Sequence, residues 1–248
     1  MNQEIADGQP RLNKQETVDQ KILLDLFAGR LGWSKAFLAR GWKVYAVDLV
    51  EPSEVPYNCH FIKADVLTLG AWTIGCSLWT TDGKLFLNCF PDFIVASSPC
   101  EEFSVHGMKL FHPNPKYPEV GIKLFNHTRA LCEAAAVPYV MENVRAAQAF
   151  VGQAVNHCGP WFLWGNAVPP LFNQGITKGA KFGAWTREQR KANKEPYYSS
   201  SSRGAKRDEI KAKMATIPPE LANCIAAYAE RLLEQRAEQR PLHREAAK

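Results

Sequence analysis

A thiol and a carboxylic acid stand at the ends of two apolar segments of this sequence. Cys100 directly follows DFIVASSP (92–99), and Glu142 lies within YVMENV (139–144). A thiolate is a nucleophile once nearby cations or backbone N–H groups lower its pKa. An acid beside it can protonate or hydrogen-bond a ring nitrogen as charge builds up, so the pair suits attack on an electron-poor ring. The alternatives are an inert buried thiol and a structural carboxyl anchor.

A glycine turn comes earlier, in DLFAGRLG (25–32), between an apolar run and a helical pattern. Bare backbone at the end of a strand and the start of a helix can approach a nucleotide-type ligand. The next two apolar runs lead to Asp48, suited to ribose hydroxyls, and Asp65, suited to an adenine amino group. Neither GxGxxG nor GKS/GKT occurs, which favours a single adenosine-bearing cofactor over a dinucleotide or triphosphate. A tight turn without a ligand is the alternative.

Short apolar runs alternate with helical patterns along the chain. We expect strands at 21–27, 43–49, 60–66, 92–98, 139–144 and 161–166, and helices at 34–40, 121–136 and 218–240. This alternation predicts an α/β fold, with a mostly parallel sheet and helices on both faces. The carboxyl ends of parallel strands meet at one edge. The thiol, the acid and the glycine turn should therefore face one crevice, with a loop containing Ser104, His106 and Gly107 after Cys100.

Composition and length limit the class of protein. The 248 residues are 46% hydrophobic and 22% charged, as in ordinary globular proteins. We expect a polar leader (1–20), a catalytic core (21–170), a short basic segment (171–215) and a C-terminal helix completing the core (216–248). No apolar run is long enough for a membrane helix, and the N-terminus lacks the pattern of a signal peptide. The seven cysteines form no CxxC pair, which indicates reduced thiols, a cytoplasmic protein and no metal site.

Positive charge is concentrated in one segment. Residues 1–170 carry a net charge of −2, whereas residues 171–215 carry +7. Basic segments commonly bind phosphate backbones, although a solvated loop is the alternative. The candidate phosphate contacts are Arg187, Arg190, Lys191, Lys194, Arg203 and Lys206.

Taken in order, these segments resemble the DNA cytosine-5 methyltransferases, and in particular the compact phage-type members. DLFAGRLGWSKAFLARG is similar to the cofactor turn of that family, and VDL and ADV are similar to the segments with its ribose and adenine acids. SPCEEFS resembles its Pro-Cys nucleophile loop, and MENV resembles its Glu-Asn-Val motif. IPPELANCIA resembles the helix that returns to complete the cofactor pocket. The resemblance covers about residues 22–170 and 216–233.

The resemblance implies a class I S-adenosylmethionine-dependent methyltransferase, Rossmann-like, with a reduced target-recognition region. Cys100 would add to cytosine C6, Glu142 would hold ring N3 and the exocyclic amine, and Asn143 would fix the loop. S-adenosylmethionine would be held by Phe27, Ala28, Gly29, Gly32, Asp48, Asp65 and Pro99. The partner would be DNA with a flipped-out cytosine, contacted by Ser104, His106 and the six basic residues above. We expect a monomer, without metal or membrane contact, in a bacterial or phage-infected cell.

Several positions depart from the family pattern. Leu31 stands where many members have the first glycine of a pair, Asp48 replaces a commoner glutamate, and Glu101 replaces a frequent glutamine. No Arg-x-Arg follows Glu-Asn-Val, and GNAVPP (165–170) is interpreted as a strand end plus turn. Two alternatives stay open. One is the same thiol chemistry on RNA, a free pyrimidine nucleotide or with a modified one-carbon donor; the other is a non-catalytic nucleic-acid-binding protein.

Overall fold

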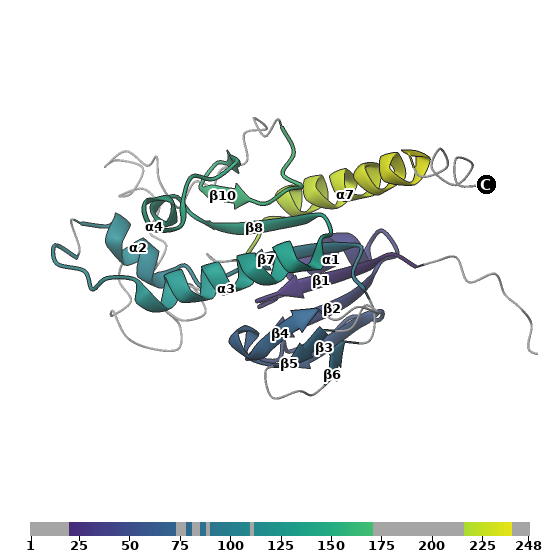
Figure 1. Ribbon diagram of the computed structural model, residues 1–248, viewed down its shortest axis with the longest axis horizontal. Coiled ribbons are helices and arrows are strands. Elements are labelled where there is room, and N and C mark those ends of the chain that lie inside the picture. The colour runs from purple at the N-terminus through teal and green to yellow at the C-terminus, as the bar shows by residue number, and fades with distance from the viewer. Residues whose placement is uncertain are drawn as a thin grey trace, which may run out of the picture.

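A seven-stranded sheet forms the centre of the molecule. The computed structural model describes residues 20–72, 78–80, 85–87, 90–109, 112–170 and 216–239. The strands of this sheet are β1 (Ile22–Leu26), β2 (Lys43–Asp48), β3 (Cys59–Lys63), β7 (Phe93–Ser97), β8 (Tyr139–Val144), β9 (Asn156–Cys158) and β10 (Trp161–Trp164). Their order across the sheet is β3-β2-β1-β7-β8-β10-β9 (Figure 1).

The sheet is mostly parallel. Strands β3, β2, β1, β7 and β8 pair in parallel, and β10 runs antiparallel to both β8 and β9. From β1 the chain builds outward to β3 and then crosses back to β7 on the other side of β1. In such sheets the crevice beyond the carboxyl ends of the strands, at this reversal, is where ligands bind. The predicted α/β, Rossmann-like fold is confirmed.

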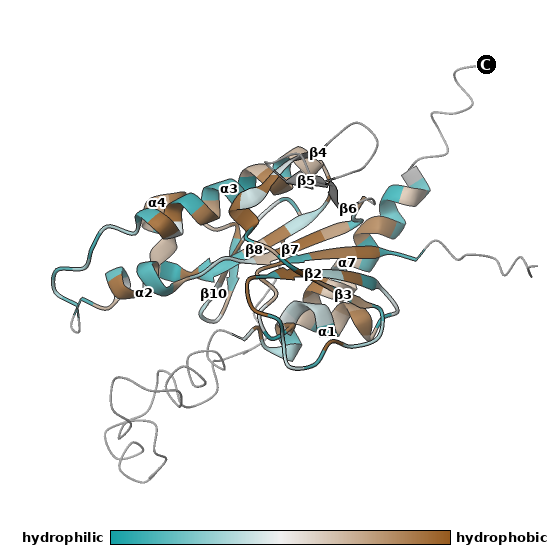
Figure 2. Cartoon of the chain, turned by 90° about the horizontal axis from the view of Figure 1, so that it is seen from below, coloured by the Kyte–Doolittle hydropathy of each residue, from teal (hydrophilic) through white to brown (hydrophobic). Residues whose placement is uncertain are grey.

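Helices cover both faces of the sheet. The predicted helices are confirmed as α1 (Gly32–Leu38), α3 (Glu119–Ala135) and α7 (Pro219–Gln239). Side chains alternate along β1, so that Leu23 packs in the core beneath α1 and α7 while Leu24 packs in the core beneath α3. Figure 2 shows the apolar strands in brown between α3 on one side and α1 on the other. This two-sided burial explains why the central strands are continuous apolar runs.

Several elements were not predicted. A second, antiparallel sheet has the order β4-β5-β6, with β4 (Leu69–Trp72), β5 (Leu78–Thr80) and β6 (Leu85–Leu87). Short helices also occur, namely η1 (Val66–Thr68), α2 (Glu101–Gly107), η2 (Arg145–Ala147) and α4 (Gln148–Val151), and β9 was missed as well. Most of these elements span only three or four residues, which is too few to show a clear periodicity.

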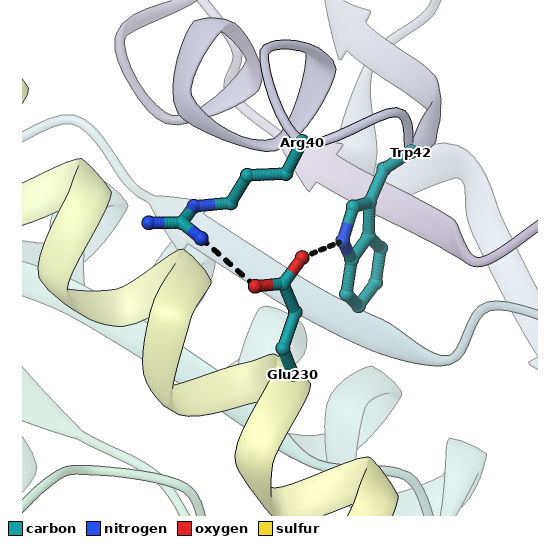
Figure 3. A network of polar contacts seen from close by, with 3 residues as sticks. All are labelled: Arg40, Trp42 and Glu230. Carbon is teal, nitrogen blue, oxygen red and sulfur yellow. Dashed lines mark hydrogen bonds and ion pairs between the residues drawn. The ribbon is translucent and has the colours of Figure 1, made fainter.

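Helix α7 is fastened beside α1 by a polar network (Figure 3). The Arg40 guanidinium donates to Glu230 Oε2 at 2.8 Å, and the Trp42 indole N–H donates to Glu230 Oε1 at 3.3 Å. Trp42 is 1% exposed, so its N–H needs this protein partner. The middle of α7 is thereby held to the residues that follow α1, and ahead of the helix Ile217 lies against Gly32.

The turn after β10 follows the prediction for GNAVPP. Gly165 has φ +127°, and a Cβ there would lie 2.2 Å from Tyr139 O, so only glycine fits. The Asn166 side chain then accepts from Tyr139 N and donates to Val137 O. This pairing fixes the end of β10 against the start of β8. Among the described helices, none is long and apolar enough to cross a membrane.

Candidate active site

The turn after β1 lies at the carboxyl edge of the sheet, and its backbone is strained. Phe27 and Leu31 both have φ 60°, in the left-handed region that non-glycine residues rarely adopt, and Gly29 has φ 50°. Ala28 N–H donates to Val47 O at 3.0 Å, and Leu31 N–H donates to Ala28 O at 2.7 Å. Strained backbone of this kind collects at ligand sites, where the surrounding structure holds it in place.

Leu31, the departure from a glycine pair, takes the conformation that glycine adopts most easily. Its side chain is 1% exposed and lies in the core beneath α1 and α7. Burial of the leucine side chain therefore offsets the cost of its left-handed backbone. The neighbouring Gly32 serves packing, because a Cβ there would lie 3.1 Å from Ile217 N. That contact lets the C-terminal segment close on the turn.

Two predicted cofactor acids lie at the carboxyl ends of β2 and β3. Asp48 Oδ2 accepts from Gly29 N–H at 2.9 Å, and its Oδ1 accepts from Val50 N–H at 3.1 Å. Asp65 caps η1 by accepting from Leu67 N–H at 2.9 Å. A carboxylate has about four acceptor positions, so both residues keep capacity for a ligand's hydroxyl or amino groups. Both are partly exposed.

Asp25 is a buried acid that the sequence analysis did not single out. It is 0% exposed in β1, and its Oδ2 accepts from Ser34 Oγ–H at 2.6 Å and from Ser34 N–H at 3.2 Å. Its Oδ1 has no hydrogen-bond partner among the described residues. Burial raises the pKa of Asp25 to about 7; the bonds from Ser34 oppose this rise and nearby Asp48 adds to it. An acid inside an apolar strand was the sequence signal for this position.

The nucleophile candidate lies where β7 passes into α2. Cys100 is partly exposed, and its carbonyl accepts from Ser104 N–H at 2.8 Å in the first helical turn. The predicted loop after Cys100 is wrong, because Glu101–Gly107 is the helix α2. Two features explain the helix: Glu101 and Glu102 suit its N-terminal end, and the Phe103 side chain is fully buried.

Helix α2 is held from two sides. Glu102 Oε2 accepts from Gly121 N–H at 2.7 Å, in the first turn of α3. On the other side a Cβ at Gly107 would lie 3.0 Å from Ala146 Cβ, so the absence of a side chain lets α2 approach η2 closely.

The two predicted nucleic-acid contacts of this segment are on α2 itself. The His106 ring pairs through Nε2 with Lys116 O at 2.7 Å and packs against Phe150, with 5.0 Å between ring centroids. Ser104 is partly exposed. Contact of either residue with nucleic acid stays a prediction.

The acid candidate lies on the strand next to the nucleophile segment. Strands β7 and β8 are parallel, and Ser97 is in register with Glu142, which is 9% exposed. Asn143 is fully buried, and its Nδ2 donates to both the carbonyl oxygen and Oγ of Ser98, each at 3.0 Å. Asn143 thus holds the residue two positions before Cys100. The structure brings the three predicted catalytic residues to the carboxyl ends of neighbouring strands.

The other described cysteines are poor nucleophiles. Burial raises the pKa of Cys59 to about 11, and it also raises the pKa of Cys132, Cys158 and Cys224. These thiols stay protonated near neutral pH, as expected for small buried hydrophobic residues.

Other predicted features fall outside the described ranges. The six basic residues proposed to contact phosphate lie in 171–215, which the structure does not describe. Cys76 and Cys89 lie in two other undescribed stretches, 73–77 and 88–89. Within the described ranges, no group of three or more His, Cys, Asp and Glu side chains is arranged to hold a metal ion.

Sequence reasoning missed the polar contacts that join these segments. The Trp33 indole N–H, from the first turn of α1, donates to Ser97 Oγ at 2.9 Å. Ser98 is likewise buried and bonded to Asn143. The paired serines at the end of an apolar strand were the available signal, because buried hydroxyls need partners.

No protein-family model and no curated protein matches the chain. Similar solved structures include 1,6-didemethyltoxoflavin-N1-methyltransferase of Burkholderia thailandensis with bound S-adenosylhomocysteine, at 17% identity and TM-score 0.31 over 59% of this chain and 53% of that one. Another is a putative methyltransferase of an antibiotic biosynthesis pathway from Anabaena variabilis, at 14% identity and TM-score 0.28 over 50% of this chain and 39% of that one. A third is the glycopeptide N-methyltransferase MtfA, at 17% identity and TM-score 0.27 over 50% of this chain and 46% of that one. The chain spans about half the length of these structures or less. Its fold class rests on the sheet order and helix placement described above.

Proposed function

We propose that this chain transfers a methyl group from S-adenosylmethionine to C5 of cytosine in DNA, through a covalent adduct at Cys100. The observation that carries the proposal is the pairing of β7 with β8. It places the segment leading to Cys100 beside Glu142 at the carboxyl edge of a parallel sheet. The turn after β1 lies at the same edge, because β1 is the other neighbour of β7. A thiol, an acid and the glycine turn thus lie at one edge of the sheet, where ligands bind in folds of this kind.

The residues around the turn fit the adenosine part of the cofactor. A Cβ at Gly29 would meet nothing closer than Phe27 O at 3.9 Å, so its backbone is open to a ligand. Asp48 and Asp65 would accept hydrogen bonds from ribose hydroxyls and an adenine amino group, with Phe27, Ala28 and the other residues named above lining the pocket. When bound, the cofactor would supply an electrophilic methyl group, and S-adenosylhomocysteine would leave as the methyl–sulfur bond breaks.

Cys100 acts as the nucleophile in this proposal. Its thiolate forms the S–C6 bond, and the electron pair of the C5–C6 double bond moves to C5, which becomes nucleophilic and takes up the methyl group. A base then removes the C5 proton, the double bond forms again, and the thiolate leaves. The thiol is regenerated unchanged, and the cytosine gains one methyl group in place of one hydrogen.

Glu142 and Asn143 have separate roles. The protonated carboxyl group of Glu142 donates a hydrogen bond to ring N3, and its other oxygen accepts one from the exocyclic amine. Both bonds stabilise the ring as Cys100 adds to it. Asn143 keeps the backbone of Ser98 in place through its two hydrogen bonds, and so fixes the approach of Cys100. Pro99, which lies between Ser98 and Cys100, limits the backbone freedom of this segment.

Trapping with 5-fluorocytosine tests this proposal. A fluorine at C5 cannot leave as a cation, so the adduct of Cys100 with fluorinated duplex DNA should persist on a denaturing gel, and only when S-adenosylmethionine is present. Cys100→Ser should abolish the adduct, because a serine hydroxyl is scarcely ionised near neutral pH. Glu142→Gln should slow trapping strongly while the protein still binds DNA, because an amide cannot supply the proton. Methyl transfer by Cys100→Ser, or an adduct on another cysteine, would disprove the mechanism.

A second experiment, run beside the trapping, separates the alternatives. Tritiated methyl transfer run in parallel on duplex DNA, RNA and free pyrimidine nucleotides identifies the substrate. Transfer to RNA or nucleotides alone would replace DNA as the substrate class. An adduct without methyl transfer would indicate a different one-carbon donor, and nucleic-acid binding without either would indicate a non-catalytic binding protein.

A further inference from the structure

One side-chain hydrogen bond joins the cofactor turn to the strand that leads to the nucleophile. Trp33 lies in the first turn of α1, one residue after Gly32, and its indole N–H donates to Ser97 Oγ at 2.9 Å. The two residues are 64 positions apart in the sequence. Trp33 is 1% exposed, so water cannot replace Ser97 as the partner of this N–H without opening the core.

Ser97 occupies a central place at this edge of the sheet. Val95 lies two positions before Ser97 in β7, and Val140 lies two positions before Glu142 in β8. Both valines belong to the core beneath α1 and α7, and side chains two positions apart in a strand share a face. Ser97 and Glu142 are therefore on the same face as Trp33, directly beside each other in register. The bond from Trp33 thus ends on the residue next to the acid.

The following residue is held from the other direction. Ser98 is 4% exposed, and its carbonyl and hydroxyl oxygens accept from Asn143. Glu142 and Asn143 are consecutive residues of β8 and point to opposite faces, so Ser97 and Ser98 are restrained from two sides. The next two residues are Pro99 and Cys100, so these three hydrogen bonds limit where the thiol can lie.

We propose that Trp33 is a positioning residue that sets Cys100 relative to the cofactor turn, through its hydrogen bond to Ser97. This inference rests on the proposed function, in which the thiol, the target carbon and the methyl donor must line up. Misplacement of a reacting group by about 1 Å can lower a rate roughly 100-fold. A tryptophan that only filled the core would need its ring alone, and loss of its N–H would then affect stability without affecting Cys100.

The test compares two buried tryptophans. Trp33→Phe and Ser97→Ala each remove one partner of the bond, and Ser97→Thr keeps a hydroxyl. Trp42→Phe is the matched control, because Trp42 is also 1% exposed and also loses an indole hydrogen bond, to Glu230. Both tryptophan variants should lose similar stability, and calorimetric affinity for S-adenosylmethionine should stay close to that of the wild type.

The readout is the rate of adduct formation with the 5-fluorocytosine duplex. We expect a loss of about 10- to 100-fold in Trp33→Phe and Ser97→Ala, rescue in Ser97→Thr, and a near wild-type rate in Trp42→Phe. The Trp33→Phe, Ser97→Ala double variant should be no slower than the slower single variant, because both changes remove the same interaction. Equal rates in the two tryptophan variants, or additive losses in the double variant, would overturn the proposal.

A second readout needs neither substrate nor cofactor. Alkylation of Cys100 by iodoacetamide, followed by mass spectrometry of its peptide, reports the surroundings of the thiol directly. Trp33→Phe should change this rate relative to the wild type, and Trp42→Phe should not. If the wild type forms no adduct with any substrate, the proposed function fails while the alkylation rates still decide whether Trp33 positions Cys100. Wild-type alkylation in Trp33→Phe would show that it does not.

Discussion

The turns after β1 and β7 leave parallel strands at the same edge of the sheet, yet they are held in different ways. Several restraints on the β1 turn come from residues close to it in the sequence. Ser34 donates to Asp25 only nine positions away, and Leu31 donates to Ala28 within the turn itself. The strained backbone at Phe27 and Leu31 is part of the same short segment. A window of about ten residues contains these restraints. The neighbouring strand β2 adds the hydrogen bonds that Ala28 and Gly29 donate to Val47 and Asp48.

The restraints on the β7 turn come from distant parts of the chain. Ser98 is held by Asn143 at a separation of 45 positions, and Ser97 by Trp33 at 64. The helix that follows is tied to α3 through Glu102 and Gly121. The β1 turn is thus shaped mainly by β1, α1 and the neighbouring β2, whereas the segment that leads to Cys100 depends on residues of α1 and β8 that are far away in the sequence. Changes in the two regions should therefore have different signatures.

The largest expected effect concerns the buried acid below the β1 turn. The ordinary pKa of Asp25 is 3.8 and burial raises it to about 7 in the folded protein. Between these values the folded state binds more protons than the unfolded state, so the stability that the protonated carboxyl provides at low pH is lost as pH rises through about 7. The full difference is on the order of 4 kcal/mol. Asp25→Asn should remove this contribution.

Urea unfolding of the wild type and of Asp25→Asn at several pH values between 4 and 8 measures the contribution of Asp25 to stability. The free energy of unfolding of the wild type, minus that of Asp25→Asn, should fall steadily over this range, because contributions from other titrating groups cancel in the difference. Two parallel pH profiles would mean that Asp25 is ionised in the folded protein. Since Ser34 and Asp25 are close in sequence, this effect should leave the packing of α2 unchanged.

The next effect tests the contact between the β1 turn and the segment that leads into α7. A Cβ at Gly32 would lie 3.1 Å from Ile217 N and Cβ and 3.3 Å from its carbonyl oxygen, and backbone cannot move aside cheaply. Gly32→Ala should therefore cost about 1–3 kcal/mol of stability and loosen α7. Gly29→Ala is the control, because its Cβ would enter open space although its positive φ adds roughly 1–2 kcal/mol of strain.

Hydrogen exchange separates these two glycine variants. Amides in the first turns of α7 should exchange faster in Gly32→Ala and at the wild-type rate in Gly29→Ala. Equal protection of α7 in both would show that the contact with Ile217 does not fasten the helix.

The central strands and long helices could be predicted from the sequence because their patterns are local. The apolar run 21–27 and the helical spacing of 121–136 each lie within one element, and β1 and α3 follow them closely. Helix α2 could not be predicted in the same way. Its seven residues include Ser104, His106 and Gly107, and it is stabilised by burial of Phe103 and by contacts with α3 and η2.

The candidate site shows the same division. Cys100, Glu142 and the β1 turn could be placed at one edge because strand ends converge in a parallel sheet, a rule that needs only the order of elements. Which side chains connect them depends on tertiary packing. Any buried tryptophan needs a partner for its N–H, but nothing within residues 30–40 identifies Ser97 as the partner of Trp33. Asp25 is an acid inside an apolar run, but the sequence does not show that it is fully buried and bonded to Ser34.

The smallest expected effect sharpens the comparison at the helix that follows Cys100. The N-cap of α3 is Pro118, which has no side-chain hydrogen bond to offer, and Glu102 of α2 supplies one to Gly121 N–H instead. Glu102→Ala should cost about 1 kcal/mol, as loss of a helix cap does, and thermal unfolding should detect it. Glu102→Gln keeps an acceptor oxygen and should recover most of this loss.

Because the cap joins two helices, Glu102→Ala should also increase hydrogen exchange at the first amides of α3, while the amides of α1 and α7 keep their protection. Equal losses in the alanine and glutamine variants would mean that the carboxylate charge matters at this position, and not the hydrogen bond. Faster exchange in α1 as well would mean that the two turns are one cooperative unit, which would end the distinction drawn between them.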